Sequence, residues 1–97
     1  TREVEEAAEI IHRRGYTIYD DLIHGANQYP PIIQTRTTAR RESGELTFRE
    51  NMAIVIQPNV ITHDERMGLQ FGETLVVRKN GCESLNSFPR EWIVCRG

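Results

Sequence analysis

The chain has 97 residues, of which 38% are hydrophobic and 27% are charged, and it carries a formal net charge of −2 with an isoelectric point near 5.9. This composition is typical of one globular domain, spanning residues 1–97, and excludes intrinsic disorder. A slightly acidic chain has no general attraction to nucleic acid or to anionic membranes. Its apolar runs are also too short to cross a bilayer.

The first residue suggests that the sequence is a fragment, and the two cysteines suggest a cellular compartment. The sequence opens on Thr1, without a methionine or a signal peptide, which is expected of a fragment. Cys82 and Cys95 lack the spacing of a metal site. Two such thiols in an acidic domain indicate a reduced state and a cytoplasmic location.

The first predicted element is an amphipathic helix over residues 2–14. Its apolar stripe has the spacing i, i+3, i+4, i+7 and consists of Val4, Ala7, Ala8 and Ile11. Acidic residues crowd the first turns and basic residues the last, which complements the helix dipole. Thr1 is placed to cap the helix, and Gly15 is placed to end it.

The rest of the chain alternates β-prone runs with turn signals. The expected extended segments are 16–19, 22–24, 32–38, 52–57, 68–79 and 82–85. Pro58-Asn59 is expected to end a strand before a polar loop, Asn80-Gly81 to form a hairpin turn, and the tail at 88–94 to form an edge strand. The fold class is therefore α+β, with one amphipathic helix packed on a mostly antiparallel sheet.

Among the histidines, His24 is the best candidate for chemistry, because it precedes a glycine at the end of a strand. A metal site made of Asp20, Asp21 and His24 is rejected, since Asp20 and His24 would lie about 13 Å apart on a straight strand. The basic segment 35–41 has no interleaved aromatic residues and is interpreted as a solvated loop rather than a nucleic-acid site. No nucleophile or phosphate-binding motif is present.

Four segments, in order along the chain, resemble a known family. They are Leu22-Ile23-His24-Gly25 followed by Pro30-Pro31, then residues 51–59 (NMAIVIQPN), 68–77 (GLQFGETLVV) and 80–85 (NGCESL). Together they resemble the end of the pita-bread metallopeptidases, which include methionine aminopeptidases, aminopeptidase P, prolidase and creatinase. The resemblance implies that residues 1–97 are the C-terminal half of a pita-bread fold, from a creatinase/aminopeptidase-like catalytic domain.

The resemblance also implies a damaged metal centre. In that family two divalent ions, such as manganese, cobalt or zinc, are held by two aspartates, one histidine and two glutamates. His24 matches the histidine and would be the catalytic residue that remains, but Gln57 stands at the first glutamate. Gly72 stands at the second, with Glu73 in place of its acidic neighbour. A neutral amide and a glycine are poor ligands for a hard cation, so this chain is expected to hold no metal.

Backbone positions of the family look better preserved than its ligands. Asn51, Asn27 and Asn59 stand at or near glycines of the family pattern, and asparagine tolerates left-handed backbone. Tyr29 falls near a further family histidine that assists proton transfer, and is taken here as a substrate-binding residue.

Two functions follow as expectations. The first is a fragment of an Xaa-Pro aminopeptidase- or dipeptidase-like metallopeptidase that is inactive as this chain. The alternative is a non-catalytic module that binds proline-containing peptides in a cleft lined by Tyr29, Phe71 and Trp92. Half of a larger sheet would expose apolar surface, which predicts a homo-oligomer. If the resemblance is real, His24, Gln57 and Gly72 meet on one face, and Gln57 bonds to protein or water rather than to a metal.

Overall fold

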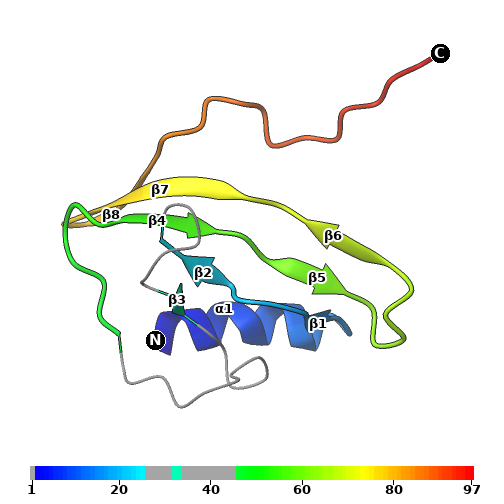
Figure 1. Ribbon diagram of the computed structural model, residues 1–97, viewed down its shortest axis with the longest axis horizontal. Helices are drawn as coiled ribbons and strands as arrows, with labels where there is room; N and C mark the ends of the chain where they lie inside the picture. The colour runs from blue at the N-terminus through cyan, green and yellow to red at the C-terminus, as the bar shows by residue number, and fades with distance from the viewer. Residues whose placement is uncertain (1, 26–31, 34–45) are drawn as a thin grey trace.

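The computed structural model describes residues 2–25, 32–33 and 46–97 (Figure 1). Helix α1 spans Arg2–Arg13, which confirms the predicted helix, and Gly15 follows it with a φ of 83° that favours glycine. Val4 and Ala8 are buried and Ile11 is half-buried. The prediction was wrong for Ala7, which is exposed, so the buried stripe is narrower than the apolar spacing suggests.

The strands are short and every pairing between them is antiparallel. In chain order they are β1 Thr17–Ile18, β2 Ile23–His24, β3 Ile32–Ile33, β4 Ala53–Ile56, β5 Asn59–Ile61, β6 Gly68–Gln70, β7 Glu73–Arg78 and β8 Gly81–Ser84. They form a three-stranded sheet in the order β1-β5-β6 and a five-stranded sheet in the order β3-β2-β4-β7-β8. The predicted α+β class is therefore confirmed, with two antiparallel sheets in place of one.

A long hairpin joins the two sheets. β4 pairs with β7, from Ala53 opposite Val76 to Ile56 opposite Glu73, and β5 pairs with β6 in the same register. The ladder is interrupted only where residues 57–58 face residues 71–72, and Pro58 has no N–H to donate there. Two predictions were wrong at this point, because β5 begins directly after Pro58 and the strand at 68–79 is divided into β6 and β7.

The hairpin at β7–β8 turns one residue earlier than predicted. Arg78 pairs with Gly81, so Lys79 and Asn80 are the two turn residues, and Gly81 has a φ of 149°. A type I turn with glycine in its last position fits this arrangement.

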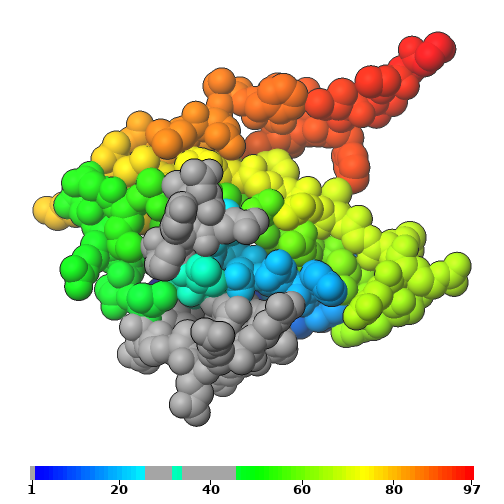
Figure 2. Space-filling view, in the orientation of Figure 1, coloured from blue at the N-terminus to red at the C-terminus, as the bar shows by residue number. Residues whose placement is uncertain are grey.

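The tail at residues 88–94 is not an edge strand, contrary to prediction. It extends away from the sheets along the side opposite α1 (Figures 1 and 2), and the Trp92 side chain is 80% exposed.

The core lies between α1 and the strands around β2 and β4. Its buried members are Val4, Ala8, Ile18, Leu22, Ile23, Ile33 and Ile54. Half-buried residues from β4 and β7, including Ile56 and Leu75, pack against this cluster. The core therefore includes Leu22 and Ile23, which directly precede His24 in the chain.

Several predicted features lie outside the described residues. These are the Thr1 cap, Asn27, Tyr29, Pro30-Pro31 and the basic segment 35–41. Of the other glycine replacements, Asn51 has the left-handed φ of 69° that was expected, whereas Asn59 belongs to the extended strand β5. None of the helical structure in the described ranges is long and apolar enough to span a membrane.

Candidate functional site

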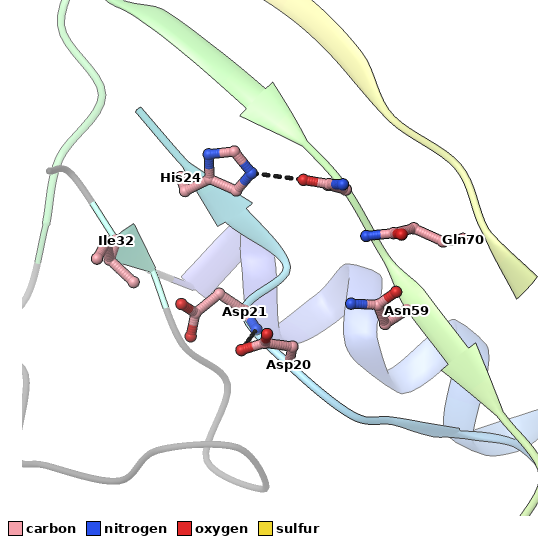
Figure 3. Close-up of a pocket in the computed structure, with 7 residues that line it drawn as sticks. Asp20, Asp21, His24, Ile32, Asn59 and Gln70 are labelled. Atoms are coloured by element: carbon pink, nitrogen blue, oxygen red, sulfur yellow. Dashed lines mark hydrogen bonds between the residues drawn. The ribbon is translucent and has the colours of Figure 1, made fainter. Parts of the chain in front are cut away.

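His24 and Gln57 meet where the long hairpin is interrupted. β2 pairs with β4 so that His24 lies opposite Val55, and the backbone N–H of Gln57 donates to the Leu22 carbonyl at 2.9 Å. The Nε2 atom of His24 lies 2.7 Å from the Gln57 side-chain oxygen (Figure 3). Its Nδ1 atom lies 2.7 Å from the Gly25 carbonyl oxygen. The amide of Gln57 thus bonds directly to the imidazole.

Both ring nitrogens of His24 face oxygen acceptors, which favours the doubly protonated imidazolium. The Gln57 oxygen is the main reason that the pKa of His24 is raised above 6.5. Partial burial opposes the rise, while the Gly25 carbonyl and the charges of Asp21 and Asp20 add to it. These contacts favour the protonated form of His24, whereas a metal ion is bound by a neutral imidazole nitrogen.

Gly72 faces Gln57 across the interruption in the ladder. A Cβ atom added to Gly72 would lie 3.6 Å from the Gln57 Cγ atom, which is ordinary contact distance. A side chain at position 72 would therefore start beside Gln57. The structure thus brings His24, Gln57 and Gly72 together from three separate segments.

Glu73 belongs to a different cluster. Its carboxylate accepts hydrogen bonds from the Ser84 hydroxyl and from Arg90, and its side chain is only 11% exposed. The Ser84 bond, followed by Arg90, lowers the pKa of Glu73, although desolvation opposes the change. Successive strand residues point to opposite faces, so Glu73 does not replace the side chain that Gly72 lacks.

A polar pocket of about 150 Å³ opens beside His24. Its lining consists of Asp20, Asp21, His24, Ile32, Gln57, Asn59 and Gln70, which surround a central space in Figure 3. Sequence reasoning missed Asn59 and Gln70 because β5 was not predicted. Asn59 is two residues from Gln57, and Gln70 is two residues from Gly72. This period of two along extended chain was the signal that could have found them.

A β-bulge brings the two aspartates into this pocket. Ile18 pairs with Val60 and Ile23 with Ile56, so the four residues 19–22 face the three residues 57–59. Such an extra residue bends a strand and redirects its side chains. The straight-strand assumption made for residues 16–24 was therefore wrong. Even so, no group of three or more His, Cys, Asp or Glu side chains within residues 2–25, 32–33 and 46–97 could hold a metal ion.

A second, more apolar pocket of about 350 Å³ lies between β6 and the tail. Leu69, Gln70, Phe71, Arg90, Glu91 and Trp92 line it. It contains Phe71 and Trp92 of the cleft proposed from the sequence, and Gln70 borders both pockets.

Comparison with known proteins gives one informative match. The chain is 33% identical over 66 residues to an ectoine hydrolase from Halomonas elongata, and the match covers 68% of this chain and 16% of that protein. The chain therefore corresponds to a small part of the relative's length. No protein-family model matches the chain. No solved structure matches it significantly.

Proposed function

We propose that this chain is part of a pita-bread hydrolase, related to the Xaa-Pro peptidases, in which the metal-binding positions have been lost. The match to ectoine hydrolase supports the family, since that enzyme is a pita-bread protein. The observation that carries the proposal is the meeting of His24, Gln57 and Gly72 at one break in the hairpin. Three positions named from the resemblance alone would have no reason to converge in an unrelated fold.

The residues present do not fit a two-metal centre. A hard divalent cation needs several anionic oxygens, but Gln57 is neutral and Gly72 has no side chain. The Gln57 oxygen is already bonded to His24, and Glu73 is engaged by Ser84 and Arg90. We therefore propose that the chain by itself does not catalyse metal-dependent peptide hydrolysis. The exposed, unpaired thiols of Cys82 and Cys95 support a cytoplasmic location for it.

The test is an assay of Xaa-Pro dipeptide hydrolysis with added manganese, cobalt or zinc. We expect no turnover above the background measured in the presence of a chelator. Turnover that a chelator abolishes would overturn the proposal.

A restored ligand set provides the matched control. The variant Gln57→Glu/Gly72→Glu would place two carboxylates beside His24, and calorimetry should show tighter manganese binding than in the unaltered chain. The variant Gln70→Glu alone, which adds one carboxylate elsewhere in the pocket, should bind manganese more weakly than the double variant. Equal manganese binding by the unaltered chain and the double variant would show that these are not former ligand positions.

A peptide-binding module is the second candidate, and the apolar pocket favours it. Phe71 and Trp92 are exposed aromatic residues that share this pocket, and proline-rich peptides dock on aromatic grooves. Thermal-shift measurements with proline-containing peptides, in the absence of metal, distinguish the two functions. Stabilisation that is lost in Trp92→Ala supports the module, whereas no stabilisation by any such peptide rejects it.

A further inference from the structure

The start of the tail is fixed to β7 and β8 by hydrogen bonds. The Leu85 N–H donates to the Thr74 carbonyl at 3.0 Å, which continues the β7–β8 ladder by one residue beyond β8. The Asn86 N–H then donates to the Ser84 hydroxyl at 3.2 Å, and this hydroxyl donates to the Glu73 carboxylate. The tail therefore leaves the sheet from a fixed point at Asn86.

Beyond Asn86 the tail is attached to the rest of the described structure by one polar contact. Arg90 donates to the Glu73 carboxylate and forms an ion pair with it. Residues 87–89 and 91–97 make no hydrogen bond or ion pair with other residues that the structure describes. The Glu73–Arg90 ion pair is therefore the polar anchor of the tail.

The two partners of this ion pair differ in exposure. The Glu73 side chain is only 11% exposed, whereas that of Arg90 is 63% exposed. When Arg90 leaves, the Glu73 carboxylate keeps its hydrogen bond from Ser84, so it is not left without a donor. Water hydrates the released guanidinium, and salt screens an exposed ion pair. Release of the tail therefore leaves no buried charge uncompensated.

The ion pair also holds one wall of the apolar pocket. This pocket is lined by two segments, residues 69–71 from the end of β6 and residues 90–92 from the tail. In Figure 1 the tail passes over β7 and towards β6 before it reaches the C-terminus. The pocket therefore exists only while the tail lies against β6, and release of the tail uncovers Leu69 and Phe71.

We propose that residues 86–92 are a strap, held against β6 by the Glu73–Arg90 ion pair, which closes the apolar pocket and opens it when the ion pair is released. The strap moves about the residues between Asn86, which is hydrogen-bonded, and Pro89, whose ring restricts the backbone that leads to Arg90. The inference is independent of both proposed functions, because it requires neither a metal ion nor a peptide.

The experiment measures paramagnetic relaxation enhancement in the ¹⁵N-labelled chain. A nitroxide is attached at Glu91→Cys, after Cys82 and Cys95 have been replaced by serine. In the closed state this label lies in the wall of the pocket, so the amide signals of Leu69 and Phe71 should be strongly broadened.

Loss of the ion pair should open the strap. Arg90→Gln should lower the ratio of closed to open states about fivefold, and with it the broadening. Arg96→Gln, the same change at an exposed tail residue outside the pocket, should leave the broadening unaltered. Glu73→Gln should act as Arg90→Gln does, and combining the two should add little, because both remove one interaction.

Salt provides a test without a change in the ion pair's residues. Raising the NaCl concentration from about 0.05 M to about 1 M should reduce the broadening in the spin-labelled chain, because the ion pair is screened. The same change should have little effect in Arg90→Gln. Arg90 is exposed, so its substitution tests the strap even if Glu73→Gln fails to fold.

A mixed sample distinguishes the strap from a contact between two chains. Here the ¹⁵N-labelled chain carries no nitroxide, and a spin-labelled chain without ¹⁵N is added. Broadening at Leu69 and Phe71 in this sample would assign the contact to a second copy and overturn the inference. The inference is also overturned if the spin-labelled chain itself shows no broadening at these residues, or if Arg90→Gln leaves the broadening unchanged.

Discussion

The residues up to Ile54 and the residues after it differ in how deeply their side chains are buried. Every buried side chain of the described structure lies at or before Ile54, whereas residues 55–97 are all half-buried or exposed. Yet the second region contains β5, β6, β7 and β8, with regular antiparallel ladders. Isolated two-stranded hairpins are marginally stable in water. The second region therefore depends on its pairing with β4 and on the core beneath it.

The candidate site lies on the boundary between these regions. His24 comes from the buried side, whereas Gln57 and Gly72 come from the break in the exposed hairpin. The comparison shows that His24 lies beside the buried core, whereas Gln57 and Gly72 lie in the break between strands and are not part of that core. Substitutions at those positions can therefore change chemistry without unfolding the chain.

The largest expected effect is on stability. Ile54→Ala removes a side chain that is only 2% exposed from a central strand, and should lower the free energy of unfolding by about 2–5 kcal/mol. Leu69→Ala, at a position that is 52% exposed, should change it by less than about 0.5 kcal/mol. Urea denaturation measures both. Equal losses would show that the two regions are equally well packed.

Self-association should depend on the exposed region. The tail exposes Phe88, Trp92 and Ile93 at 69%, 80% and 66%, and clustered apolar surface of this kind drives association. We expect a dimer or larger assembly in sedimentation velocity. Replacing all three residues with serine should weaken association tenfold or more, or by about 1.4 kcal/mol. A monomer at high concentration would contradict this expectation.

A smaller effect is expected at the Glu73 cluster. Ser84→Ala removes the main hydrogen bond that lowers the pKa of Glu73, so this pKa should rise toward its ordinary value of 4.5. A lowered folded-state pKa stabilises the protein above the unfolded-state pKa, and that stability is lost as pH falls through the folded-state value. Denaturation at pH 7 and pH 3 should therefore show a smaller difference in Ser84→Ala than in the unaltered chain. An unchanged difference would show that Arg90 alone sets the ionisation of Glu73.

The sequence predicts the elements that local periodicity determines. The stripe from Val4 to Ile11 predicts α1, and the apolar run at 52–57 predicts β4, because helix and strand periods are read within a few residues. It does not predict the bulge at residues 19–22, since a register slip depends on a partner strand far away in the chain. The tail at 88–94 was predicted as an edge strand from its short apolar run, but no strand forms there and its apolar residues are exposed.

The candidate site, like the fold, could be predicted only in part from the sequence. The resemblance selected His24, Gln57 and Gly72, which the structure brings together, but it also selected Glu73, which binds Ser84 and Arg90 instead. Their roles in catalysis stay predictions. Asp21 could not be placed from the sequence, because the bulge that brings it into the pocket is a tertiary feature.

The smallest effect, and the most local, is the ionisation of His24. Its pKa is raised above 6.5, mainly by the Gln57 oxygen, so its stabilising effect is fully present below pH 6.5 and is lost as pH rises through the folded-state value. Gln57→Met removes the acceptor at similar size, and the pKa of His24 should fall. An NMR titration of the His24 Cε1 proton measures the change, and Gln70→Met, in the same pocket, should cause a smaller one. If Gln57→Met left the pKa unchanged, the contact between Gln57 and His24 would not be what raises the pKa of His24.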